Sequence, residues 1–135
     1  MDFPLVMGAP VHVLPSHINV ELDVAPLQVQ GPKSKDLMKD LLGPSILDLK
    51  YYFWRKAEIK GVPVVITRTG WTSEVGYEVY LLDPTKGSVI WDTLLEVGKN
   101  YNVNPTGPSD IRRVEGGILN WGADILLEDT PYHVG

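Results

Sequence analysis

The residues best suited to chemistry lie at positions 67–80, which have the sequence TRTGWTSEVGYEVY. This stretch joins two apolar runs, and a simple hairpin loop needs only about two to five residues. Here the connection contains a bulky aromatic, Trp71, and an acid, Glu74, between Gly70 and Gly76. A carboxylate held in a loop accepts two hydrogen bonds, which suits a ligand with adjacent N–H donors, such as the edge of an amidine-like heterocycle. Trp71 would offer a flat face to the same ring.

The sequence leaves two interpretations of this loop open. In the first, Trp71 and Glu74 form one wall of a ligand pocket. In the second, Glu74 is a surface acid in a hairpin loop and Trp71 covers the core. In both interpretations, Gly70 and Gly76 are expected at sharp turns of the backbone.

A second group of charged residues consists of Arg112, Arg113 and Glu115. Arg113 and Glu115 flank Val114, so they do not share its face of a helix. A buried arginine paired with a carboxylate would be structural, whereas an arginine at the rim of a pocket would hold an anionic tail. Both interpretations of Arg113 remain open.

The remaining candidates for chemistry are scattered along the chain. The sequence has no P-loop, no GxGxxG after a strand, no HExxH and no GxSxG. His12, His17 and His133 lie far apart in the sequence, and surface or packing roles are expected for them. Glu21 and Asp23 are expected at a solvated edge. No metal site is therefore predicted.

The composition limits the classes of function. The 135 residues suit one domain, and 44% hydrophobic and 21% charged residues are ordinary for a globular protein. The net charge of -5 argues against a nucleic-acid partner. No apolar run approaches the roughly 18 residues that a membrane helix needs, and the first residues do not resemble a signal peptide. Because the chain has no Cys, a disulfide or thiolate site is excluded, and we expect a reducing, cytoplasmic compartment.

Alternating apolar residues predict the strands that hold the loop. Strands are expected at 25–30, 51–59, 62–67 and 77–82, with a short extended run at 11–14. Lys60 and Gly61 provide a turn, so the last three long strands should form an antiparallel meander.

Helical spacing of apolar residues predicts three helices. The first begins with Ser34 as its N-cap and ends at Gly43-Pro44. The others cover 88–99 and 110–121, and no pattern is evident from 123 onward. The inward residues would be Ile90, Trp91, Leu94 and Val97 or Leu95 in the first of these two, and Ile111, Val114, Ile118 and Leu119 in the second. The pair Gly116-Gly117 suggests close packing against another backbone. Because strands and helices are segregated, the fold class is α+β.

Four segments together resemble a known family. They are LQVQGPKS at 27–34, TRTGWTSEVGYEVY at 67–80, WDTLLEVGK at 91–99 and RVEGGILNWGADI at 113–125. Their order and spacing resemble the folate-binding domain of the aminomethyltransferase family, which includes the glycine cleavage T-protein and dimethylsulfoniopropionate demethylase. The resemblance covers roughly residues 25–125.

The resemblance implies tetrahydrofolate as cofactor and transfer of a methyl or aminomethyl group. In this chain Glu74 would contact the pterin ring and Trp71 would pack on it, in place of the usual Tyr. Arg113 would anchor the fold or the folate tail. The donor would be a small methylated amine or sulfonium, or a carrier-bound aminomethyl group. In a full-length protein, Glu74→Ala is then expected to abolish folate binding while leaving the fold intact.

The chain also departs from the family pattern. Where the T-protein has an arginine linked to the acidic tail of the folate, this chain has Ser109, which is more similar to the demethylase branch. The resemblance implies that the segment with the Asp thought to act in catalysis, and the C-terminal barrel of the family, lie outside the part of the family pattern that this sequence matches. We therefore expect residues 1–135 to be a partial folate-binding domain, and no catalytic residue is assigned. The alternative is a non-catalytic folate-binding or scaffold domain, which could form a homo-oligomer detectable by sedimentation.

Overall fold

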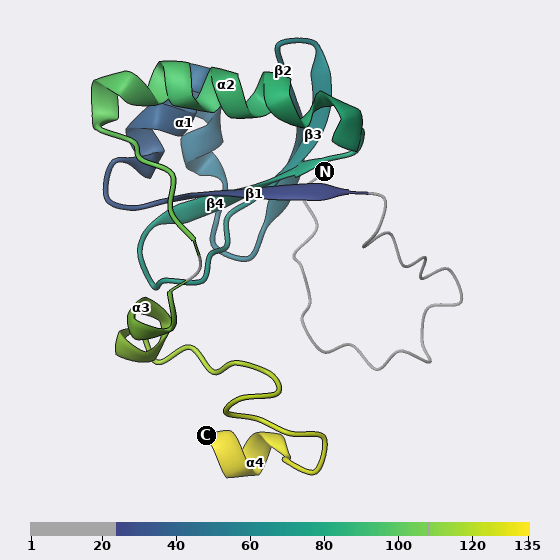
Figure 1. The fold of residues 1–135 in the computed structure, drawn as a ribbon, viewed down its shortest axis with the longest axis vertical. Coiled ribbons are helices and arrows are strands. Elements are labelled where there is room, and N and C mark those ends of the chain that lie inside the picture. The colour runs from purple at the N-terminus through teal and green to yellow at the C-terminus, as the bar shows by residue number, and fades with distance from the viewer. Residues whose placement is uncertain (1–23, 108) are drawn as a thin grey trace.

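The computed structural model describes residues 24–107 and 109–135, which build a four-stranded antiparallel sheet with two helices against one face (Figure 1). The strands are β1 (Ala25–Gln30), β2 (Trp54–Ile59), β3 (Val62–Thr67) and β4 (Gly76–Leu81), in the order β1-β4-β3-β2. The α-helices are α1 (Ser34–Leu42), α2 (Gly87–Gly98), α3 (Asp110–Glu115) and α4 (Pro131–Val134), and short 3-10 helices occupy Pro44–Asp48, Pro84–Lys86 and Lys99–Tyr101. The α+β prediction is confirmed. The expectations for 11–14, His12, His17, Glu21 and Asp23 lie outside the described residues.

The predicted meander is also confirmed, since β3 pairs antiparallel with both β2 and β4. Lys60 and Gly61 have φ angles of 51° and 79°, so both turn residues are left-handed, as a two-residue hairpin turn of the primed type requires. Strand β1 then pairs with β4 and completes the sheet.

Strand β2 begins at Trp54, three residues later than predicted. Tyr52 has a φ of 65°, which interrupts the extended backbone. The Tyr52 N–H still donates to the Arg68 carbonyl at 3.1 Å, so the aromatic run is a kinked continuation of the strand.

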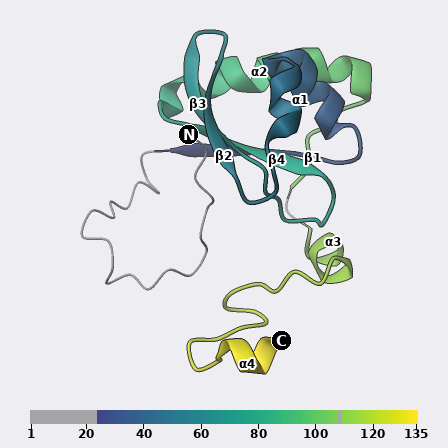
Figure 2. The ribbon, with the colours of Figure 1, turned by 180° about the vertical axis from the view of Figure 1, so that it is seen from behind.

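The core lies between the sheet and the helices α1 and α2, which cover the same face (Figures 1 and 2). Alternate residues of β3 and β4 point into it, as the period of two predicts. The buried apolar residues are Leu37, Met38, Ile46, Leu49, Ile59, Val62, Val64, Ile66, Tyr77, Val79, Leu81, Ile90 and Leu94.

Helix α1 begins at Ser34, but Ser34 is not its N-cap. The N-cap is Lys33, and the buried Ser34 hydroxyl donates to the Val75 carbonyl at 2.8 Å. The prediction of a capping role was wrong because this hydroxyl satisfies a carbonyl of the β3–β4 loop. At the other end, Gly43 with a φ of 84° stops the helix, as expected.

Helix α2 follows its predicted bounds within one residue. Ile90 and Leu94 are buried and Val97 packs partly against the core, as expected. Trp91 is 41% exposed, so its predicted inward position is wrong. Because successive residues on a helix are about 100° apart, Trp91 lies beside the buried stripe that Ile90 and Leu94 define.

Helix α3 ends at Glu115, although the pattern predicted a helix over 110–121. Gly117 has a φ of 69°, and the Ile118 N–H donates to the Arg113 carbonyl at 2.8 Å. This is the Schellman arrangement, in which a left-handed glycine closes the last turn of a helix. The pair of glycines therefore contains the stop signal of the helix.

The predicted inward face of this helix is also wrong. Ile111 and Val114 are 74% and 62% exposed, whereas Arg113 is buried. Helix α3 is too short to bury an apolar stripe, and polar contacts attach it to the rest of the chain. It lies away from α1 and α2, past the opposite side of β1 and β4, and α4 lies beyond it (Figures 1 and 2). None of the helices in the described ranges has the length and apolar character to cross a membrane.

Candidate functional site

The loop between β3 and β4 is shaped around the side chain of Gln30, the last residue of β1. Gln30 Nε2 donates to the Thr69 carbonyl at 3.3 Å, and the Thr72 hydroxyl donates to Gln30 Oε1 at 2.7 Å. A Cβ at Gly70 or Gly76 would lie 2.0 or 2.2 Å from Gln30 Nε2. Neither glycine has a positive φ, so the expected sharp turns at these positions are wrong. Space for the Gln30 amide requires glycine at both.

The actual turn of the loop is at Ser73, whose φ is 58°. A non-glycine residue in this conformation is uncommon and needs support from its surroundings. The Ser73 hydroxyl donates to the Gly116 carbonyl at 2.9 Å, and a Cβ at Gly116 would lie 2.2 Å from Ser73 Oγ. Gly116 therefore permits the close approach of another backbone that the pair Gly116-Gly117 suggested. This contact attaches the loop to the end of α3.

The far end of the loop is attached to β1 and α1. The Val75 carbonyl accepts hydrogen bonds from the Gly31 N–H at 2.9 Å and from the Ser34 hydroxyl. Arg68 Nη1 donates to the Gly76 carbonyl at 3.0 Å. The loop is thus fixed at both ends and at its turn, which makes it a rigid support for the side chains between them.

The three residues expected to bind a cofactor differ in their surroundings. Glu74 is exposed and has no hydrogen-bond partner among the described residues. Trp71 is half-buried, and the guanidinium carbon of Arg113 lies 6.0 Å from its ring centroid. Such a separation is within the range of a cation–π contact. The fold therefore brings Trp71 and Arg113 together, with Glu74 three residues along the same loop.

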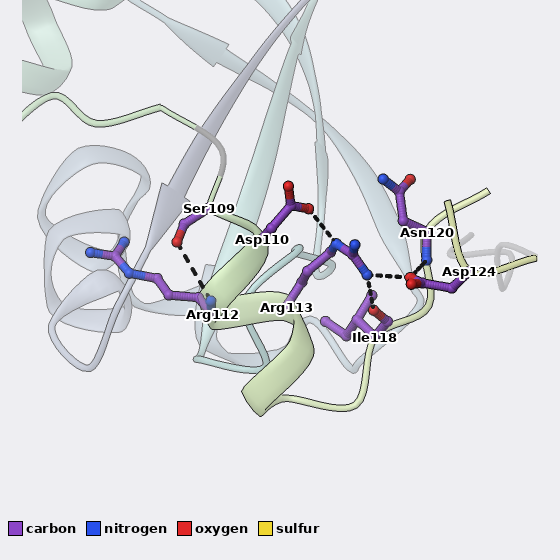
Figure 3. A network of polar contacts seen from close by, with 7 residues as sticks. All are labelled: Ser109, Asp110, Arg112, Arg113, Ile118, Asn120 and Asp124. Atoms are coloured by element: carbon purple, nitrogen blue, oxygen red, sulfur yellow. Dashed lines mark hydrogen bonds and ion pairs between the residues drawn. The ribbon is translucent and has the colours of Figure 1, made fainter. Parts of the chain in front are cut away.

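Arg113 is the centre of a polar network at the start of the C-terminal segment (Figure 3). Its Nε donates to Asp110 Oδ1 at 2.6 Å, and its Nη1 donates to the Ile118 carbonyl at 3.1 Å and to Asp124. The Asn120 N–H also donates to Asp124, at 2.8 Å. Arg113 thus joins α3 to the chain that follows it. This geometry corresponds to the interpretation of Arg113 as a buried arginine paired with a carboxylate.

The charges of this network stabilise each other. Hydrogen bonds to Asp110 and then Asp124 raise the pKa of the Arg113 guanidinium. The pKa of Asp124 is lowered, first by the hydrogen bond from the Asn120 N–H and then by Arg113. Asp124 is therefore charged in the folded protein at any pH above its ordinary range.

We predict that Asp124→Ala lowers the stability of the folded state more at pH 7 than at pH 3. A carboxyl whose folded pKa is depressed stabilises the protein fully above its unfolded pKa of about 3.9 and loses this contribution as pH falls through the lower folded pKa. Urea unfolding at pH 7 and pH 3 would show the gap between wild type and variant closing at acid pH. Asp92→Asn, on the exposed side of α2, is the control. A gap that is equal at both pH values would contradict the role of the Asp124 charge.

Arg112 and Glu115 do not belong to this network. Arg112 points away from it (Figure 3) and lines a groove of about 550 Å³ together with Lys33 and Tyr101. The Arg112 N–H donates to Ser109 Oγ at 3.5 Å, so Ser109 is the N-cap of α3. Glu115 is exposed.

A second carboxylate, Glu78, was missed in the sequence. It lies in β4 on the sheet face opposite α1 and α2, and four side chains donate to it. Gln28 donates to Glu78 Oε1 at 3.0 Å. Three hydroxyls donate to Glu78 Oε2: those of Thr67 at 3.2 Å, Tyr80 at 3.1 Å and Thr69. The available signal was the GYE triplet after the loop, where an acid interrupts a strand rich in apolar residues.

Tyr80 provides a spectroscopic test of this cluster. Its burial, and then the charge of Glu78, raise the pKa of its phenol to about 12. We predict that Tyr80→Phe removes one late-ionising phenol from an absorbance titration at alkaline pH. A raised phenol pKa stabilises the fold below the unfolded value of about 10, and this contribution is lost as pH rises toward 12. Tyr101→Phe gives the reference size of the change, because Asp40 raises the pKa of Tyr101 to about 12 at a site outside the cluster and this variant should also lose one late-ionising phenol. An unchanged late transition in Tyr80→Phe would contradict the cluster.

His133 has a structural position. Its Nδ1 accepts from the Thr130 N–H at 3.3 Å and lies 3.5 Å from Asp129 Oδ1, so it helps to cap the short helix α4. Within residues 24–107 and 109–135, no three His, Asp or Glu side chains gather in a way that could hold a metal ion.

Comparison with known proteins identifies the family. The family described as GCVT N-terminal domain matches residues 14–135. The chain is 38% identical over 116 residues to dimethylsulfoniopropionate demethylase DmdA of Ruegeria pomeroyi, covering 86% of this chain and 32% of that protein. It is 34% identical over 120 residues to an aminomethyltransferase of Saccharopolyspora erythraea and 32% identical over 121 residues to one of Thermoanaerobacter pseudethanolicus, covering 87% of this chain and 32% of each relative.

The chain spans about a third of the length of the curated relatives that it matches. The family match nevertheless extends over most of this sequence and includes the β3–β4 loop, Glu78 and the Arg113 network. The chain therefore belongs to the GCVT N-terminal domain family.

Proposed function

We propose that this chain forms a tetrahydrofolate-binding part of an enzyme that transfers a methyl or aminomethyl group. The observation that supports this most is the Glu78 cluster, a carboxylate held by four side-chain donors next to the loop of Trp71 and Glu74. The names of the relatives, aminomethyltransferase and dimethylsulfoniopropionate demethylase, point to the same kind of transfer. Because the chain spans about a third of these proteins, we assign the complete reaction to the whole protein.

The residues present fit a pterin ring, which is flat and has adjacent N–H donors on one edge. Glu78 Oε1 accepts one hydrogen bond, from Gln28, and retains capacity for a ligand N–H. Glu74 offers a second acceptor on the loop, and Trp71 offers an aromatic face. Arg113 would act on this site by holding Trp71, since its guanidinium already pairs with two carboxylates.

When bound, tetrahydrofolate supplies the nitrogen N5 that accepts the one-carbon unit. The contribution of this chain is to orient the folate, which lowers the entropic cost of bringing donor and acceptor together. We propose a small methylated amine or sulfonium, or a carrier-bound aminomethyl group, as the donor. A cytoplasmic location is proposed because the chain has no Cys.

The first test is a calorimetric titration of the protein with tetrahydrofolate under reducing conditions. We expect saturable binding of tetrahydrofolate. We expect no binding of p-aminobenzoylglutamate, which lacks the pterin, over the same concentrations. A parallel titration followed by Trp fluorescence should lose most of its signal in Trp71→Phe, which leaves the other three of the four Trp residues. Equal binding of both compounds would contradict pterin recognition by this site.

A second measurement separates the enzyme from the non-catalytic alternative. Tetrahydrofolate and candidate donors are incubated with the protein, and methyl- or methylenetetrahydrofolate is measured by mass spectrometry. Product that depends on the protein supports transfer. Folate binding without product from any donor supports a binding or scaffold role.

A further inference from the structure

Gln30 connects the two parts of the candidate site through one side chain. Its Nε2 donates to the carbonyl of Thr69, whose hydroxyl in turn donates to Glu78. Its Oε1 accepts from Thr72, which follows Trp71 directly in the chain. Both hydrogen-bonding atoms of the Gln30 amide are therefore used by the β3–β4 loop, one on each side of Gly70.

The loop is also built to admit this amide. Gln30 lies opposite Gly76 in the pairing of β1 with β4, and its side chain passes between Gly76 and Gly70. Any Cβ at either glycine would overlap the Gln30 amide, at 2.0 to 2.8 Å. Since neither glycine has a positive φ, backbone conformation alone does not require glycine there. The two glycines and Gln30 form one packing unit, the Gln30 clamp.

We infer that Gln30 is a positioning residue, which fixes the loop in the conformation that presents Trp71, Glu74 and Glu78 to a ligand. Ordering a loop of this length costs conformational entropy for every residue, and a loop ordered in advance does not lose that entropy on binding. The hydrogen bonds of the Gln30 clamp supply this order from a rigid strand. The part of this inference that concerns ligand affinity rests on the proposed function, whereas the part that concerns loop order does not.

The test compares three variants by amide hydrogen exchange of the peptide that covers residues 69–76. Gln30→Met keeps the length of the side chain and removes both hydrogen bonds, so exchange in this peptide should rise on the order of tenfold or more. Gln30→Glu retains the acceptor for Thr72 and loses the donor to Thr69, so it should give an intermediate rate. Lys35→Met, at an exposed position of α1, should not change it.

The comparison of Gln30→Glu with Gln30→Met distinguishes positioning through hydrogen bonds from simple filling of space. If Gln30 only occupied volume, Gln30→Met and Gln30→Glu would protect the loop equally well, and this result would overturn the inference. Exchange in the β2–β3 hairpin serves as the internal control, because global destabilisation would raise exchange there as well. A rise in both regions by the same factor would also overturn it.

The glycines provide an independent test by double substitution. Gly70→Ala places a Cβ on the Gln30 amide and should release the loop as Gln30→Met does. In a Gln30→Ala background that overlap is gone, so adding Gly70→Ala should change exchange little further. Additive effects of Gly70→Ala and Gln30→Ala would contradict the Gln30 clamp.

The affinity for tetrahydrofolate completes the test. If wild type binds tetrahydrofolate, Gln30→Met should weaken binding about tenfold or more, with Gln30→Glu between the two. Unchanged affinity would overturn the role in the binding site. If wild type does not bind tetrahydrofolate, the proposed function fails, and the hydrogen-exchange results alone decide whether Gln30 positions the loop.

Discussion

Substituting Glu78→Gln is expected to weaken tetrahydrofolate binding about 10- to 100-fold, which corresponds to the loss of one charged hydrogen bond of roughly 1.5–3 kcal/mol. The carboxylate has its orientation set by Gln28, Thr67, Thr69 and Tyr80 before any ligand arrives. A glutamine of the same shape cannot accept through both terminal atoms, because its amide nitrogen would face groups that donate. The variant therefore loses both the charge and the orientation of the acceptor.

Isothermal titration calorimetry of wild type, Glu78→Gln, Glu74→Gln and Glu58→Gln would measure this effect. Glu58 is the matched control, since it is an exposed acid of β2 on the same face of the sheet. We expect the larger loss from Glu78, because the exposed side chain of Glu74 must be ordered when the ligand binds. A full loss of binding in Glu74→Gln with normal binding in Glu78→Gln would transfer the role to the loop acid. Normal binding in both variants would refute a carboxylate contact.

The second large effect is expected in the core. Ile66→Ala should lower the free energy of unfolding by about 2–5 kcal/mol, the usual cost of removing a large buried aliphatic side chain. Ile66 is fully buried in β3, between β2 and β4, and faces α1 and α2. Native domains have only about 5–15 kcal/mol of stability, so this substitution removes a large part of it.

Urea unfolding followed by circular dichroism would measure the change. Leu82→Ala is the control, because Leu82 is 49% exposed just after β4 and should cost little. A loss for Ile66→Ala no greater than that for Leu82→Ala would mean that the packed layer between sheet and helices does not provide the main stability of the fold.

The strands could be predicted from the sequence because local chemistry determines them. Alternation of apolar residues set the register of β3 and β4, and Lys60-Gly61 set the reversal between β2 and β3. These signals involve residues a few positions apart, which is the range over which the backbone itself enforces a conformation.

Helix α3 shows where such signals mislead. Apolar residues at helical spacing predicted a helix over 110–121 with Ile111 and Val114 inside, but Gly117 ended α3 and both side chains are exposed. The buried residue is Arg113, which pairs with the carboxylate of Asp124. This partner lies eleven positions further along the chain. Periodicity measures where apolar groups lie on a helix and contains no information on a distant carboxylate.

The fold class, the meander of β2, β3 and β4, the loop as the region of interest and the resemblance to the family could all be predicted from the amino-acid sequence. The contacts of the loop residues became evident from the folded chain. The sequence indicated that Gly70 and Gly76 are turn residues. In the fold, the side chain of Gln30, which lies about forty positions earlier, occupies the space between them. In the sequence, Glu78 has the features of an ordinary strand residue. In the fold, four side chains donate hydrogen bonds to its carboxylate. The physical reason is that hydrogen bonds and close packing depend on distances in space, and only the folded chain brings residues so far apart in sequence within a few ångströms.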